Sequence, residues 1–319
     1  MFLFIILQFT MITCNIMGGL GNQLFQIFTT IATGIRDGHK IVFPYVESTN
    51  YGTVTRYTFW DNFLASILIF TNKNTTDEGI SNKALSEVPS YNFFFHNYTI
   101  IPKIEQFQNI RLHGYFQSYK YFIDQQDIIF KLIRLDELIE SVKAENSHLI
   151  TSNAQMGENE IHNDNADNPY TISMHFRLGD YKYIQNCHNI LPYEYYEKSL
   201  ERIINTISYN NQSIRILFFC EHEDNEYVFR IIDRLKLLPI PHPITYIKVD
   251  DTIVDWKQML LMSACHANII ANSTFSWWGA YFNRVSDKIV CYPSEWFGPA
   301  LRHNYMGDMF PDDWIRIVV

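Results

Sequence analysis

The chain has 319 residues, of which 47% are hydrophobic and 16% aromatic, so it is long and apolar enough for sizeable cores and about two domains. Its formal net charge of −9 at pH 7 argues against a nucleic-acid-binding protein, because a phosphate backbone requires a basic face. The five cysteines are scattered and show no Cys-x-x-Cys pair or metal-finger spacing, which favours a reducing compartment and no structural metal.

The first ten residues are apolar, but no Lys or Arg precedes them and the run is too short to span a bilayer. We therefore expect neither a signal peptide nor a transmembrane helix. The protein is expected to be cytoplasmic or peripheral at a membrane. Met11 stands directly before a strand pattern, so translation from Met1 and from Met11 are both compatible with the sequence.

The N-terminal part predicts a parallel βαβ unit. An apolar strand over 12–17 is followed by the turn Gly18-Gly-Leu-Gly-Asn22, a helix with apolar spacing over 24–35, and a strand over 40–43. The turn is a poor dinucleotide fingerprint, because the third glycine is missing and the second strand ends at a proline. Two interpretations stay open: Asn22 is the N-cap of the helix, or Asn22 and Gln23 present amides to a polar ligand.

Further along, helices are expected near 60–68 and over 119–143, whereas most of 57–110 carries no readable pattern. Between 141 and 168, Asn, Glu, Ser and Asp replace apolar residues, so we place the domain boundary in this polar linker. The predicted domains are 1–168 and 169–319.

The second domain alternates strands and helices. Strands are expected over 170–174, 215–219, 244–249 and 268–271, and helices over 192–207, 226–237 and 255–265. This pattern predicts an α/β fold of two Rossmann-like domains with parallel sheets that face each other across a cleft.

The strand over 170–174 runs into His175-Phe-Arg177-Leu-Gly-Asp180-Tyr. Ligands of open α/β sheets bind beyond the carboxyl ends of the strands, and an arginine there offers a planar charged fork to phosphate oxygens. The alternative is an ordinary ion pair between Arg177 and Asp180. Asp180 has three candidate roles: orienting the arginine, capping the next helix, or acting as a general base.

The segment Asn272-Ser-Thr-Phe-Ser276-Trp-Trp follows the strand over 268–271 and opens a helix. Hydroxyls and N–H groups at a helix N-terminus bind anions, so this segment is a candidate phosphate site opposite Arg177. The alternative is capping by Ser273 or Thr274, with the two tryptophans in the core.

Two acidic features have competing interpretations. Glu221-His-Glu223 follows the strand over 215–219 and is the nearest approach to a carboxylate pair for a divalent ion, but an acidic loop is usually solvated. Asp255 opens a helix with an Asp-x-x-Gln pattern that resembles a capping box, and a contact to guanine is its alternative role.

The motifs together resemble glycosyltransferase family 11, the α-1,2-fucosyltransferases. The resemblance spans about residues 11–319 and is carried by Gly18-Gly-Leu-Gly-Asn-Gln-Leu-Phe-Gln26, Gly114-Tyr-Phe-Gln-Ser118, the segment 175–181, and Asn272-Ser-Thr-Phe-Ser-Trp-Trp-Gly-Ala-Tyr281. It implies a GT-B fold with an acceptor-side N-terminal domain and a GDP-sugar-binding C-terminal domain. It also implies inverting transfer of L-fucose from GDP-fucose to the 2-hydroxyl of a galactoside-type glycan acceptor, with no metal or other cofactor. No nucleic-acid partner is expected, and peripheral membrane association stays open.

The resemblance also implies roles for single residues. Arg177 matches the arginine that binds the donor diphosphate, His175 lines the nucleotide, and Asn22 matches an amide near the reacting sugar. The catalytic candidates are Arg177, Asn22 and Asp180. The donor-binding candidates are His175, Arg177, Gly19, Gly21, Asn22, Asp255, Asn272, Ser273, Thr274, Phe275 and Ser276.

One residue departs from the family pattern: the second arginine of the motif His-x-Arg-Arg-Gly-Asp-Tyr is Leu178 here. The missing arginine suggests an alternative, a catalytically silent protein that binds a sugar nucleotide or a glycan. A metal-dependent glycosyltransferase that uses Glu221 and Glu223 is another, and an NAD oxidoreductase is weakened by the defective glycine fingerprint.

Overall fold

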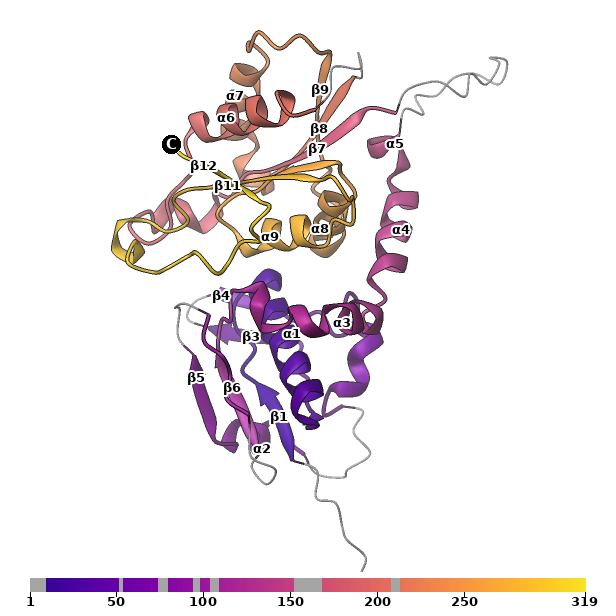
Figure 1. The fold of residues 1–319 in the computed structure, drawn as a ribbon, viewed down its shortest axis with the longest axis vertical. Helices are drawn as coiled ribbons and strands as arrows, with labels where there is room; N and C mark the ends of the chain where they lie inside the picture. Colours follow the sequence, from indigo (N-terminus) through magenta and orange to yellow (C-terminus); the bar gives the residue numbers. More distant parts are fainter. Residues whose placement is uncertain are drawn as a thin grey trace, which may run out of the picture. The chain divides into compact units, whose positions relative to one another are not determined.

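The computed structural model describes residues 10–51, 54–73, 80–93, 98–103, 109–151, 168–207 and 213–319. These residues form two compact units, Met1–Asp136 with Asn304–Pro311, and Glu137–His303 with Asp312–Val319 (Figure 1). The two units divide between residues 136 and 137, before the polar segment 141–168 in which we predicted the domain boundary. Both units are α/β, as predicted.

The first unit is built on a four-stranded parallel sheet of order β2-β1-β6-β5. Its strands are β1 (Met11–Cys14), β2 (Lys40–Ile41), β5 (Ser90–Phe93) and β6 (Ile110–Gly114). Helix α1 (Leu20–Asp37) connects β1 to β2 and completes the predicted βαβ unit. The remaining elements are the antiparallel pair β3 (Ser48–Tyr51) and β4 (Val54–Tyr57), and the helices η1 (Ala65–Phe70), α2 (Asn82–Glu87), η2 (Tyr119–Tyr121), η3 (Ile123–Gln125) and α3 (Gln126–Leu132).

Three predictions for this unit need correction. The strand expected over 40–43 is only two residues long, and Phe43 forms an isolated bridge to Thr71 just before Pro44, which has no N–H to continue the ladder. The helix expected over 60–68 is a turn followed by the 3₁₀ helix η1. The helix expected over 119–143 is interrupted, because Arg134 has a φ of 56° and this left-handed residue separates α3 from the next helix.

The second unit contains a six-stranded sheet of order β12-β11-β10-β7-β8-β9, in which every pair is parallel. Its strands are β7 (Tyr170–His175), β8 (Ile214–Phe219), β9 (Ile244–Lys248), β10 (Ala267–Ile269), β11 (Ile289–Pro293) and β12 (Ile315–Ile317). The principal helices are α4 (Leu135–Glu145), α5 (Ser147–Ile150), α6 (Tyr193–Ile204), α7 (Asn225–Leu235), α8 (Asp255–Ser263) and α9 (Thr274–Tyr281). This strand order is that of a Rossmann fold.

Two sets of contacts explain why the units divide where they do. Arg215 on β8 donates to the carbonyl groups of Leu149 (2.9 Å) and Thr151 (2.8 Å), and Lys257 forms an ion pair with Glu145. These bonds attach α4 and α5 to the second unit.

The C-terminal segment 304–311 returns to the first unit through Asp308. The carboxylate of Asp308 forms an ion pair with Lys120 and accepts from the backbone N–H of Tyr98 (3.1 Å), while its carbonyl accepts from the hydroxyl of Ser118. The sequence showed no sign of this return. Among the described residues, no helix is both long and apolar enough to cross a membrane.

Candidate active site

The carboxyl edge of the second sheet brings two of the sequence motifs together. From β7 the chain builds the sheet outward through β8 and β9, and it then returns to the other side of β7 to form β10. Strands β7 and β10 are hydrogen-bonded neighbours, with Met174 paired to Ile269. Such a reversal of strand order is a topological switch point, where ligands of open α/β sheets bind. The segment that begins at His175 and the segment that begins at Asn272 leave the sheet at this point.

Arg177 is held by three neighbours. One terminal nitrogen of its guanidinium contacts the carboxylate of Glu221 and the other contacts that of Asp180, and the group lies 4.8 Å from the ring centre of Tyr181. Burial opposes the charged form, but Tyr181, Glu221 and Asp180 outweigh it and raise the pKa of Arg177. The ion pair with Asp180, considered as an alternative from the sequence, is therefore present. It holds a permanently charged group at the switch point.

Tyr181 links the two segments that meet at the switch point. Its hydroxyl donates to the carbonyl of Asn272 (3.2 Å), and its ring stacks on His188 at 4.7 Å between centres. Because Arg177 lies over the same ring, the phenol supports the guanidinium and ties it to the start of α9. Sequence reasoning did not single out Tyr181 or His188, although Tyr181 closes the motif that contains Arg177.

His175, the last residue of β7, is a neutral group. Burial, followed by the charge of Arg177, lowers its pKa to about 3. Its ring centre lies 5.6 Å from that of Phe275, and its Nδ1 is buried without a hydrogen-bond partner among the described residues. An orphaned polar atom in a site of this kind is a group that a bound ligand can satisfy.

The start of α9 confirms the capping interpretation made from the sequence, and its role as a phosphate site stays a prediction. Ser273 is the N-cap, and its hydroxyl accepts from the N–H of Phe275 (3.3 Å). Ser276 is buried and accepts from the N–H of Ala271 (3.2 Å), while the amide of Asn272 donates to the carbonyls of Asn189 (2.8 Å) and Trp296 (3.2 Å). Ser276 and Asn272 therefore stabilise the turn between β10 and α9 through these hydrogen bonds. Thr274 and Phe275 are half-buried at the helix start, and Trp277 and Trp278 lie in the core, as the capping alternative predicted.

The acidic loop after β8 lies beside this site. The carboxylates of Glu221, Glu223 and Asp224 are close enough together to hold a metal ion by spacing alone. Each has a protein partner, however: Glu221 contacts Arg177, Glu223 contacts Lys182 (3.8 Å), and Asp224 contacts Lys182 and accepts from the N–H of Gly179 (2.9 Å). The charge that a divalent ion would bring is already supplied by two cationic side chains.

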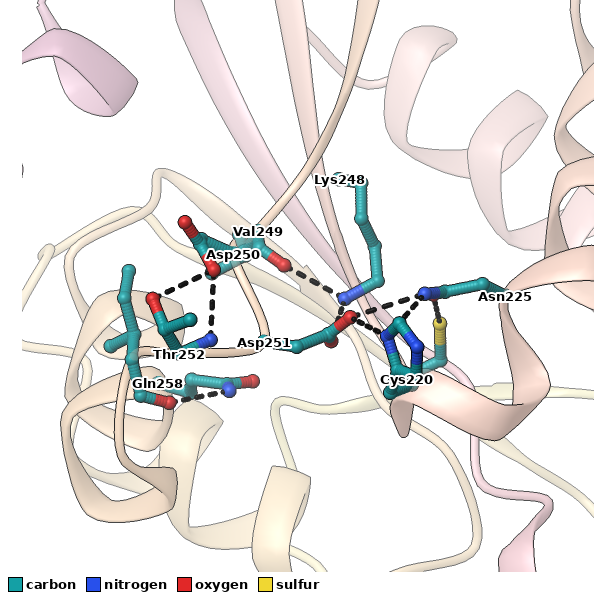
Figure 2. Close-up of polar contacts among 10 residues, drawn as sticks. Cys220, Asn225, Lys248, Val249, Asp250, Asp251, Thr252 and Gln258 are labelled. Carbon is teal, nitrogen blue, oxygen red and sulfur yellow. Dashed lines mark hydrogen bonds and ion pairs between the residues drawn. The ribbon is translucent and has the colours of Figure 1, made fainter.

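The loops after β8 and β9 are tied to each other (Figure 2). Asp251 accepts from Asn225 (3.1 Å) and contacts Nδ1 of His222 (3.0 Å), while Lys248 donates to the carbonyl of Val249 (2.7 Å). Asp250 accepts from both the N–H and the hydroxyl of Thr252 (2.8 Å each). The contacts of Asp251 with His222 and Asn225 connect the acidic loop to the loop after β9.

The capping box predicted for α8 is not formed. The N-cap is Val254, and Asp255 is the first helical residue, whose carboxylate accepts from the N–H of Trp256 (2.8 Å). The side chain of Gln258 donates to the carbonyl of Ile253 (2.7 Å) instead of reaching the N-cap N–H (Figure 2). The helix starts one residue earlier than the pattern requires. A contact of Asp255 to guanine stays a prediction.

The glycine turn of the first unit also differs from its prediction. Gly18 has a φ of 76°, Gly19 is the N-cap and α1 begins at Leu20, so Asn22 lies in the first turn and is not the N-cap. The Asn22 side chain accepts from the amide of Gln117 (3.0 Å). Gln23 is buried, and its amide nitrogen donates to the carbonyls of Gly18 (3.0 Å) and Tyr57 (2.8 Å), while its Oε1 is buried without a hydrogen-bond partner among the described residues. The presentation of its amide to a ligand stays a prediction.

The predicted site residues therefore form two groups. Gly19, Gly21 and Asn22 belong to the first unit, and the group of the second unit contains His175, Arg177, Asp180, Asp255, Asn272, Ser273, Thr274, Phe275 and Ser276. Leu178, which replaces an arginine of the family motif, is 3% exposed and belongs to the apolar core of the second unit.

The two α/β units have parallel sheets, and the second combines the strand order of a Rossmann fold with a charged arginine at its switch point, as in α/β proteins that bind nucleotide ligands at the carboxyl edge of the sheet. The chain belongs to glycosyltransferase family 11, and the model of that family, described as "Glycosyl transferase family 11", matches residues 10–317. The protein is thus a glycosyltransferase.

Two relatives from Escherichia coli are similar in sequence. The O-antigen biosynthesis glycosyltransferase WbnK is 32% identical over 157 residues, which are 48% of this chain and 46% of that protein. The chain therefore spans about half the length of this relative. The alpha-1,2-colitosyltransferase is 24% identical over 338 residues, which cover 97% of this chain and 99% of that protein.

Solved structures are more distant. A mutant of Arabidopsis thaliana FUT1 in complex with GDP is 10% identical, with a TM-score of 0.48, and the match covers 95% of this chain and 75% of that one. A family 9 glycosyltransferase from Veillonella parvula is also 10% identical, with a TM-score of 0.42 and coverage of 98% and 86%.

Proposed function

We propose that the protein is an inverting α-1,2-fucosyltransferase. It would move L-fucose from GDP-fucose to the 2-hydroxyl of a galactoside-type acceptor in glycan synthesis, without a metal ion. Membership of family 11 supports the reaction class, and the full-length relative named for an α-1,2 transfer supports the linkage. The observation that carries the proposal is Arg177, a charged and mostly buried side chain at the switch point of the sheet.

Inversion in a single displacement requires that the leaving diphosphate be stabilised while its bond to the sugar breaks. A guanidinium that is already oriented does this without reorganisation during the reaction. Asp180 and Tyr181 hold Arg177 in place, so we assign Asp180 an orienting role and not that of a general base. The N-terminus of α9, with its positive end of the helix dipole, would add to the stabilisation.

The other candidate residues have proposed roles in the binding of the two substrates. Neutral His175, with Thr274 and Phe275, would line the donor, and Asp255 would contact the guanine. In the first unit, Asn22 and Gln117 form an amide pair next to the glycine turn of Gly19 and Gly21, and we assign this pair to the acceptor sugar, because amides bind hydroxyl groups through donor and acceptor at once.

Removal of divalent metals is expected to leave transfer unchanged. Arg177 already supplies the positive charge, and the carboxylates of Glu223 and Asp224 are engaged by Lys182 and a backbone N–H. The measurement is turnover with GDP-fucose and a galactoside in excess EDTA, with magnesium-saturated EDTA as the matched control. Activity that is lost in EDTA and restored by Mg²⁺ or Mn²⁺ would favour the metal-dependent alternative instead.

The identity of the donor sugar has a second candidate. The full-length relative is named a colitosyltransferase, so the corresponding colitose nucleotide belongs beside GDP-fucose in the first donor panel. Transfer is measured by mass spectrometry of the acceptor, and the linkage by NMR of the product. Binding of either nucleotide without transfer to any galactoside would favour the silent binding protein suggested by Leu178.

A further inference from the structure

Arg177, whose guanidinium we assign to the diphosphate of the donor, also contacts Glu221, a residue without a role in the proposed mechanism. Both terminal nitrogens of Arg177 contact carboxylates, one of Asp180 and the other of Glu221. A diphosphate needs the same nitrogens. We propose that Glu221 competes with the diphosphate of the donor for Arg177 and is displaced when the donor binds. This competition sets the affinity of the site for the donor, and it acts only on ligands that carry a phosphate. This inference rests on the proposed function of Arg177.

Of the two carboxylates that contact Arg177, that of Glu221 can move away from the guanidinium more easily than that of Asp180. Asp180 lies three residues after Arg177 on the same turn and is 42% exposed, whereas Glu221 comes from the loop after the neighbouring strand β8 and is 53% exposed. An exposed carboxylate recovers its hydration when it swings into solvent, so breaking its ion pair costs little. The longer side chain of glutamate also has one more rotatable bond than that of aspartate.

The turn between Arg177 and Asp180 is shaped to admit Glu221. Gly179 has a φ of 41°, and a Cβ on it would lie 2.7 Å from Oε2 of Glu221 and 3.1 Å from a terminal nitrogen of Arg177. A side chain at this position would therefore require the carboxylate of Glu221 to shift. Glycine leaves the space that brings the carboxylate against the guanidinium.

The backbone around Glu221 is anchored on the C-terminal side. The carboxylate of Asp224 accepts from the N–H of Gly179 (2.9 Å), and Asn225 is bonded to Asp251 (3.1 Å) in the loop after β9. Rotation of the Glu221 side chain alone is therefore enough to release Arg177. The loop itself does not need to move.

Competition of this kind has a quantitative consequence. The apparent dissociation constant of a ligand is its intrinsic value divided by the fraction of molecules in the competent state. If Glu221 contacts Arg177 in about nine molecules of ten, removing its charge lowers the apparent dissociation constant of GDP by about tenfold. Guanosine has no phosphate, so its affinity does not depend on whether Arg177 is held.

The experiment compares Glu221→Gln with Glu223→Gln by isothermal titration calorimetry with GDP and with guanosine. Glu223 is a matched control, because it belongs to the same loop and carries the same charge but pairs with Lys182. We expect Glu221→Gln to bind GDP about tenfold more tightly. Glu223→Gln should stay within about twofold of the unsubstituted chain, because its ion pair is exposed. Neither change should alter the affinity for guanosine.

Equal or weaker binding of GDP by Glu221→Gln would overturn the proposal, since Glu221 would then orient Arg177 for the donor. If that variant does not fold, as judged by circular dichroism, Glu221→Asp decides: its shorter side chain keeps the charge but withdraws it from Arg177, so GDP should again bind more tightly. Arg177→Ala is included as a reference. If it binds GDP normally, the proposed function fails; if it loses GDP while Glu221→Gln shows no gain, only the role of Glu221 fails.

Discussion

Arg177→Ala is expected to lower kcat/KM for fucosyl transfer by about 10²–10³-fold, the usual cost of removing one preorganised donor to a developing negative charge. The loss includes binding as well as chemistry, because Asp180 and Glu221 would remain as two carboxylates without their shared cation. Their charges would repel the diphosphate in the ground state and in the transition state. The measurement is steady-state transfer from GDP-fucose to a galactoside, together with the affinity for GDP.

Arg177→Lys is the control that separates charge from geometry. Lysine keeps a single positive charge but lacks the planar fork, so it cannot serve two carboxylates or two phosphate oxygens in the same way. We expect activity between those of the alanine variant and the unsubstituted chain. Near-normal turnover by Arg177→Ala, with an unchanged thermal unfolding curve, would contradict the assignment of Arg177 to the diphosphate.

The sequence predicted most of the second unit because its strands and helices have strong patterns of their own. The run over 170–174 became β7, and the motif after it lies at the carboxyl end of a parallel strand, as expected. What the pattern did not contain is the strand order. Only the pairing of β10 with β7 shows that the segments beginning at His175 and Asn272 leave the sheet side by side.

Two features of the domain division depend on contacts between residues far apart in the chain. The polar segment 141–168 suggested a linker, and residues 152–167 of it lie outside the described residues, but α4 and α5 are attached to the second unit by Arg215 and Lys257. The attachment of 304–311 to the first unit depends on Asp308 and Lys120, which are 188 positions apart. No local pattern predicts such pairs.

In the candidate site, too, the residues of one motif could be predicted from the sequence, but contacts between residues far apart in the chain could not. The arginine, the glycine and the aspartate of the motif were identified from one short stretch. Glu221 was considered as half of a metal-binding pair, because its own surroundings in the sequence are acidic. Its contact with Arg177 joins residues that are 44 positions apart, and this contact adds the interpretation of Glu221 as the partner of a cation.

Leu178→Arg, which restores the second arginine of the family motif, is expected to destabilise the second unit. Leu178 is 3% exposed and belongs to the apolar core, so the new guanidinium would be removed from water and placed among apolar side chains. An uncompensated buried charge costs about 3–5 kcal/mol. The measurement is urea unfolding followed by circular dichroism.

Leu178→Met is the matched control, because it conserves volume and apolar character and should cost less than about 1.5 kcal/mol. If both variants unfold as expected, the leucine is a core residue of this chain, and the loss of the arginine does not by itself argue for a silent protein. A Leu178→Arg variant as stable as the unsubstituted chain would show that position 178 can reach a ligand. Increased transfer by such a variant would then identify the contact to donor or acceptor that the leucine removed.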